Sequence, residues 1–212
     1  MLTIAIVVFA NFAIQDRLLV AGNVAETARN IVEHERLFRF GIACELIYGA
    51  GITVLLAALY VILEPVDRLL ALIGAVSRLA YALTWLLMTL DLFSALKLFR
   101  SNDYLRIFEP DRLQALGRMY IGARFETYYA GLFFYGLASS VCSWLWVKSG
   151  YLPRGLAVFG VISSVWAVAC TLAFIVSPDF SQAVNLWWFD SPLGLFEITL
   201  SFWLLIKGLR PR

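Results

Sequence analysis

Seven charged side chains lie inside stretches of the sequence that are otherwise apolar, and they are the residues best placed to do chemistry. They are Arg39, Glu45, Arg78, Asp91, Arg124, Glu126 and Glu197. A charge at the centre of a bilayer costs roughly 2.5–3.5 kcal/mol on insertion scales, so such residues are expected to face the interior of a helix bundle. Held there, they could bind a polar head group, exchange a proton or join helices through ion pairs.

The charges do not balance, because three arginines face four carboxylates. One carboxylate therefore lacks an arginine partner, and an unpaired buried carboxylate tends to take up a proton. Glu45 and Glu197 are the candidates. With a rise of about 1.5 Å per residue, Glu45 lies about 12 Å inside its helix, and Asp91 and Glu197 lie about 8 Å from the ends of theirs. These depths are measured from the same membrane face, which predicts a polar layer in one leaflet.

Tyrosines and small residues follow the charges at helical spacing. Tyr128 lies four residues after Arg124, on the same predicted face. Tyr128 and the seven charged residues are therefore our predicted ligand-binding cluster. Gly136 with Ser140 and Gly160 with Ser164 have the small-xxx-small spacing that lets helix backbones approach closely.

The elements that must position this cluster are membrane spans. Of the 212 residues, 61% are hydrophobic and 15% are charged, which is too little polar surface for a soluble globule. Hydropathy along the sequence predicts six membrane spans: Met1–Ile14, Leu37–Leu63, Leu69–Leu96, Met119–Val147, Gly155–Ser177 and Pro192–Lys207. The sequence thus predicts a single transmembrane domain over residues 1–212, an all-α bundle of six transmembrane helices with a short first one.

Residues 23–36 differ from the spans because charged and apolar residues alternate there with helical period. Asn23 can cap a helix with Glu26 three residues on, and Val24, Ala28, Ile31 and Val32 share one face. We predict an amphipathic surface helix after the first span.

Three segments resemble a known family: ERLFRFG at 35–41, YLPRGLAV at 151–158, and LFE at 195–197 followed by WLLIKG at 203–208. They are similar to the bacterial membrane family called domain-of-unknown-function family 4386. The resemblance covers essentially the whole chain and implies a multi-helix inner-membrane protein with a cytoplasmic C-terminus. It implies no activity, cofactor or catalytic residue.

The basic residues in the connections give a divided indication of orientation. The basic tail and the connection 177–191, which contains no Lys or Arg, favour a cytoplasmic C-terminus. The opposite side nevertheless carries more basic residues in total. We therefore base the predicted cytoplasmic C-terminus on the tail and that connection. The predicted localisation is a multi-pass protein of the bacterial inner membrane.

Several kinds of chemistry find no support in the sequence. His34 is the only histidine, so a metal centre or haem with two histidines from this chain is excluded. The three cysteines have no CxxC spacing. A net charge of +2 without a basic run argues against nucleic acid as a partner. We expect no catalytic residues, metal or cofactor, and membrane lipids as partners.

Three functions remain open. The first is a non-catalytic binding, sensing or accessory protein whose polar layer holds a small molecule or lipid head group. The second is a proton-coupled transporter in which Glu45, Asp91 or Glu197 changes protonation. The third is an intramembrane lipid-modifying enzyme with arginines on phosphate and a carboxylate as base.

Overall fold

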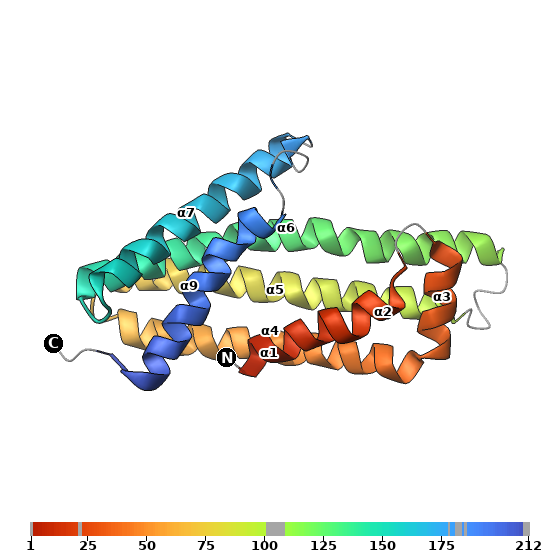
Figure 1. The fold of residues 1–212 in the computed structure, drawn as a ribbon, viewed down its shortest axis with the longest axis horizontal. Helices are drawn as coiled ribbons and strands as arrows, with labels where there is room; N and C mark the ends of the chain where they lie inside the picture. Colours follow the sequence, from red (N-terminus) through yellow and green to blue (C-terminus); the bar gives the residue numbers. More distant parts are fainter. Residues whose placement is uncertain are drawn as a thin grey trace. The chain divides into compact units, whose positions relative to one another are not determined.

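The computed structural model describes residues 2–20, 23–100, 109–177, 179–180, 184 and 186–209, and every regular element in them is helical (Figure 1). The predicted all-α class is confirmed. Among the described residues, five helices are long and apolar enough to cross a bilayer. They are α4 (Glu35–Leu63), α5 (Arg68–Phe99), α6 (Pro110–Ser149), α7 (Arg154–Val176) and α9 (Leu186–Ile206).

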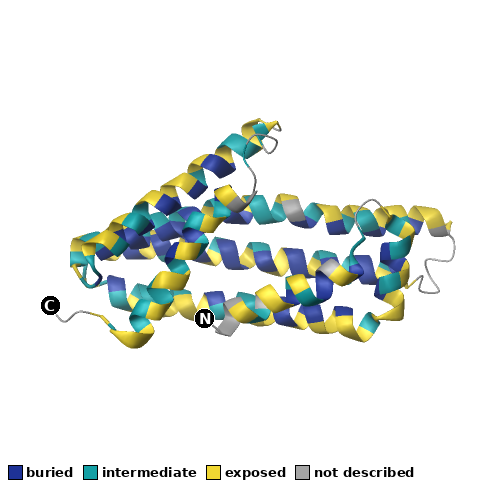
Figure 2. Cartoon of the chain, in the orientation of Figure 1, coloured by how far each residue is buried: buried dark blue, intermediate teal, exposed yellow. Residues whose placement is uncertain are grey.

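Exposed positions, yellow in Figure 2, recur along these helices, and many of them hold large apolar residues. Val54 of α4, Ile162 of α7 and Leu205 of α9 are each more than half exposed. Exposing so much apolar surface to water would cost about 25 cal/mol per Å², whereas the hydrocarbon of a bilayer solvates it. The fold is therefore that of a helical membrane protein.

The chain before α4 folds into shorter elements. The predicted first span, Met1–Ile14, corresponds to α1 (Leu2–Phe9) and most of a π-helical turn, η1 (Ala10–Gln15), which α2 (Asp16–Leu18) follows. These elements are not among the five long apolar helices. In a π-helix each hydrogen bond closes over one more residue than in an α-helix, so the side chains that follow it are rotated relative to the α-helical pattern.

Helix α3 (Val24–Glu33) is the predicted amphipathic helix. Asn23 caps it, since its side chain accepts a hydrogen bond from Glu26 N at 3.0 Å and donates one to Glu26 Oε2 at 2.9 Å. Ala28 and Ile31 are buried as predicted. The predicted face is off by part of a turn, because Val32 is exposed and Thr27 is buried. Thr27 can be buried because its hydroxyl donates to the backbone oxygen of Asn23.

Helix α6 begins nine residues before its predicted span, at Pro110 instead of Met119. Proline suits a first helical turn because its missing N–H has no acceptor there. The added turns pack closely on α5: a Cβ atom on Gly117 would overlap the ring of Phe99. At about 1.5 Å per residue, the 40 residues of α6 reach about 60 Å, which is twice the thickness of the hydrocarbon core.

Helix α9 also begins before its predicted span, at Leu186 instead of Pro192. Proline inside a helix leaves the carbonyl four residues earlier without its N–H donor. Here that carbonyl belongs to Trp188, and the indole N–H of Trp166 donates to it at 3.0 Å. A side chain of α7 thus replaces the missing backbone bond.

The chain divides into two compact units. The N-terminal unit comprises Leu2–Gly51 and Leu83–Tyr128, and its core includes Ile14, Ile31, Phe38, Leu92 and Leu96. The C-terminal unit includes Ile52–Ala82 and Tyr129–Arg212, and its core includes Leu63, Ala71, Leu145, Trp146 and Leu152. Helices α4, α5 and α6 contribute to both units. The single domain over residues 1–212 stays a prediction.

Asp67, in the turn between α4 and α5 of the C-terminal unit, makes two polar contacts. Lys148 Nζ donates to Asp67 Oδ2 at 2.9 Å, and Leu70 N donates to Asp67 Oδ1 at 3.2 Å. The Lys148 ammonium, helped by the Leu70 N–H, holds the pKa of the Asp67 carboxyl below its ordinary value.

A lowered folded-state pKa makes this contact sensitive to acid. Its stabilising effect is complete above the unfolded value of about 3.9 and is lost as pH falls through the folded-state value. We expect the Asp67→Asn variant to lack this part of the acid-induced loss of stability. Thermal midpoints of the detergent-solubilised protein over the acidic range measure it, with Asp111→Asn, an exposed acid of the other unit, as control. Parallel pH profiles for the wild type and Asp67→Asn would contradict the prediction.

Candidate functional site

Three polar side chains meet inside the N-terminal unit: Gln15, Glu45 and Arg124. Gln15 ends the π-helical turn η1, Glu45 lies ten residues into α4, and Arg124 lies on α6. Their exposed fractions are 6%, 1% and 8%. An arginine and a glutamate buried this completely are stabilised by pairing with each other, because an unpaired buried charge is strongly destabilising.

The three side chains form a closed ring of hydrogen bonds, which we call the Arg124 cluster. Arg124 Nη1 donates to Gln15 Oε1 at 2.6 Å, and Arg124 Nη2 donates to Glu45 Oε1 at 3.3 Å. Gln15 Nε2 donates to the same Glu45 oxygen at 2.7 Å. Gln15 therefore connects the two charged partners and holds the glutamate oxygen that Arg124 also contacts.

Two polar atoms of the Arg124 cluster have no hydrogen-bond partner among the described residues. They are the acceptor Glu45 Oε2 and the donor Arg124 Nε, and both are fully buried. A buried polar atom without a partner costs about 1–3 kcal/mol, and more when it belongs to a charged group. The ion pair therefore keeps one donor and one acceptor that a further polar group could satisfy.

Asp91 adds a second negative charge to this environment. It lies half-buried on α5, within electrostatic range of Arg124. One guanidinium thus faces two carboxylates. The surplus of negative charge disfavours an anionic ligand and favours a neutral or cationic one.

A second polar cluster lies inside the C-terminal unit and contains Arg78, Ser139 and Glu197. Arg78 Nη2 donates to Ser139 Oγ at 3.1 Å and to Glu197 Oε1 at 3.4 Å. The Ser139 hydroxyl donates to the same glutamate oxygen at 3.4 Å. The guanidinium also lies 5.5 Å from the centre of the Tyr135 ring, within the range of a cation–π contact. We call this the Arg78 cluster.

The predicted site residues form two sets of direct contacts. Arg124 contacts Glu45, with Asp91 nearby, whereas Arg78 contacts Glu197. The function of both clusters as ligand sites stays a prediction.

Three further predicted residues are not buried. Tyr128 is half-buried, and Arg39 and Glu126 are exposed. We expected Arg39 to face the interior. It lies at the surface instead, because it pairs there with Glu35 one turn earlier, at 2.6 Å. Glu35 also pairs with Arg100 at 3.1 Å. These charges satisfy one another at the surface of the N-terminal unit.

Sequence reasoning missed Gln15 and Ser139. Ser139 lies eleven residues after Tyr128, three helical turns along the same face of α6, so helical spacing could have found it. Gln15 carried no such signal, because hydropathy placed it just after the first span and periodicity cannot reveal a π-helical turn.

In the described part of the chain, no group of three or more His, Cys, Asp or Glu side chains could hold a metal ion. Cys44, Cys142 and Cys170 are free thiols in the interior.

The fold and its two buried ion pairs define the class of this chain as a multi-helix membrane protein with charged side chains in its interior. Residues 1–208 match the family described as a domain of unknown function, DUF4386, and the chain belongs to that family. No curated protein and no solved structure matches the chain.

Proposed function

We propose that this protein is a non-catalytic binding protein of the bacterial inner membrane, with its C-terminus in the cytoplasm and the Arg124 cluster as its ligand site. The observation that carries the proposal is the pair of unpaired buried atoms, Glu45 Oε2 and Arg124 Nε. Membrane lipids are the proposed partners of the apolar outer faces.

The chemistry of the two atoms favours a hydroxyl group. A hydroxyl oxygen accepts a hydrogen bond from Arg124 Nε, and its hydrogen can go to Glu45 Oε2, so one group satisfies both. A hydroxyl adds no charge, which suits a site where Asp91 already leaves a negative surplus. The proposed ligand is thus a hydroxylated small molecule or a lipid with a hydroxylated head group.

Native mass spectrometry of the gently solubilised protein tests this proposal. We expect a hydroxylated molecule to stay bound to the wild type and to be lost from Glu45→Gln, because the amide nitrogen that replaces Oε2 donates and cannot accept. Glu126→Gln, a change at an exposed glutamate, is the matched control and should retain the molecule. Extraction and identification of the bound mass separates a lipid from a soluble compound.

Three results would overturn the proposal: a wild-type protein without a bound molecule, equal retention by Glu45→Gln, or a bound molecule that carries no hydroxyl.

The same glutamate oxygen favours a second function, proton-coupled transport. A proton on Glu45 Oε2 would leave both hydrogen bonds to Oε1 in place. In proteoliposomes that contain a pH-sensitive dye, we expect a transporter of this kind to couple ligand addition to a pH change that Glu45→Gln abolishes. An unchanged internal pH would show that the protein binds the ligand without proton-coupled transport.

A further inference from the structure

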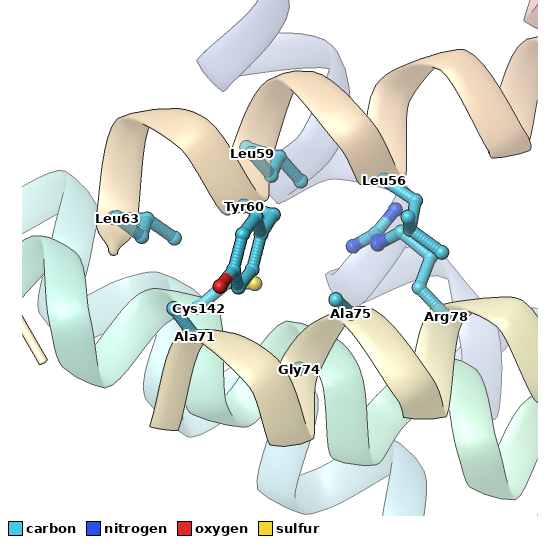
Figure 3. Close-up of a pocket in the computed structure, with 9 residues that line it drawn as sticks. All are labelled: Leu56, Leu59, Tyr60, Leu63, Ala71, Gly74, Ala75, Arg78 and Cys142. Carbon is cyan, nitrogen blue, oxygen red and sulfur yellow. The ribbon is translucent and has the colours of Figure 1, made fainter. Parts of the chain in front are cut away.

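A small cavity lies among α4, α5 and α6 in the C-terminal unit (Figure 3). Its lining includes Leu56 and Tyr60 from α4, Gly74, Ala75 and Arg78 from α5, and Cys142 from α6. The volume open to the centre of a water molecule is about 10 Å³, which is close to the least that holds one water. The cavity is therefore the size of one water molecule, and a lipid head group does not fit it.

One charged residue lines this cavity with an unused donor. Arg78 is 4% exposed, and its Nε has no hydrogen-bond partner among the described residues. Its Nη2 is already engaged by Ser139 and Glu197. In Figure 3 its side chain extends from α5 toward Leu56 of α4, with the Tyr60 ring farther along the cavity. A buried guanidinium donor without a partner is costly, so we expect a hydrogen-bond acceptor in the adjoining cavity.

We propose that this cavity binds a water molecule whose oxygen accepts a hydrogen bond from Arg78 Nε. A buried water needs two to four polar partners. Tyr60 and Cys142 also line the cavity, with the Tyr60 hydroxyl beside Cys142 in Figure 3, and their oxygen and sulfur are the acceptors that we propose for its hydrogens. Tyr60 suits this role because its own hydroxyl donates to Glu64 Oε1 at 3.2 Å, which leaves its oxygen lone pairs available.

The water completes a polar connection through the C-terminal unit. Through Tyr60 it joins Arg78 to Glu64, whose side chain is 40% exposed at the end of α4. Through Arg78 it reaches Glu197 of α9. The water thus hydrates the buried Arg78 guanidinium and connects it to Glu64 beside the α4–α5 turn. The inference lies in the other unit from the Arg124 cluster and does not rest on the proposed function.

Hydroxyl-radical footprinting by X-ray pulses tests for this water, since radicals formed from an internal water oxidise the side chains beside it. The sample is the wild-type protein in lipid nanodiscs. Cys142 lines the cavity, whereas Cys44 and Cys170 are buried cysteines that do not. We expect Cys142 to be oxidised several-fold faster than either.

Filling the cavity provides the second arm of the test. Ala75→Leu places a larger side chain in the water's volume and should lower Cys142 oxidation to the rate of Cys170. Ala80→Leu, a half-buried alanine on the same helix outside the lining, is the matched control and should leave the rate unchanged. Equal oxidation of the three wild-type cysteines would overturn the proposal, and that comparison needs no variant, so it holds even if Ala75→Leu does not fold.

Discussion

Arg124→Ala should lower the free energy of unfolding by about 3–5 kcal/mol, because it removes one partner of a buried ion pair and leaves the other charged without compensation. Glu45 is 1% exposed and would lose its only cationic contact in the Arg124 cluster. Gln15 Oε1 would lose its donor in the same step. Unfolding under reversible conditions in bicelles, with thermal midpoints as a second readout, measures the loss.

Two single variants set the scale for this loss. Arg39→Ala removes an exposed arginine whose surface pair is worth about 0–1 kcal/mol. Glu197→Gln should also be tolerated better than Arg124→Ala, because its amide oxygen can still accept from Arg78 and Ser139. A loss for Arg124→Ala no larger than that for Arg39→Ala would contradict the prediction.

The double variant Arg124→Leu with Glu45→Leu separates the cost of a stranded charge from the value of the pair. Replacing both members of a buried ion pair by apolar residues is often neutral or stabilising. We therefore expect the double variant to be more stable than Arg124→Leu alone. A simple sum of the two single losses would show that the two side chains act independently.

The second large effect is expected at Gly160 of α7, in the C-terminal unit. A Cβ atom there would lie 2.5 Å from ring atoms of Phe196 and 2.6 Å from Ser143 Oγ. Phe196 and Ser143 are both buried, so neither can move away freely. Gly160→Ala should cost about 1–3 kcal/mol by overpacking, although alanine favours a helix elsewhere.

Gly155→Ala is the matched control on the same helix, because nothing lies within 4 Å of its added Cβ. We expect it to change the thermal midpoint little in either direction. The two variants are compared in the same detergent, and equal midpoints would show that the C-terminal unit tolerates the added methyl at Gly160.

Close helix approach was predictable from the small residues. The spacings of Gly136 with Ser140 and of Gly160 with Ser164 indicated it. In the structure a Cβ on Gly136 would lie 2.7 Å from Val168 Cγ2. Helix ends were less predictable, because hydropathy reports where apolar residues occur and not where backbone hydrogen bonds stop. Leu186–Asp190 joins α9 through a contact with Trp166 that lies 22 residues away in sequence and leaves no local pattern.

The candidate site was partly predictable for a similar reason. The cost of charge in an apolar span singled out Glu45 and Arg124, and both are buried in one cluster. The same argument failed to separate them from Arg39, because a long side chain near the end of a span can find a partner at the surface. Gln15 depends on the π-helical turn η1, a backbone feature without a residue signature.

The central claim, that Glu45 Oε2 and Arg124 Nε together bind a hydroxylated ligand, is tested most directly by a high-resolution experimental structure in lipid nanodiscs. We predict non-protein density within hydrogen-bond distance of both atoms, with the shape of a hydroxylated group. Direct hydrogen bonds from other side chains to both atoms, with no density for a ligand, would contradict the account.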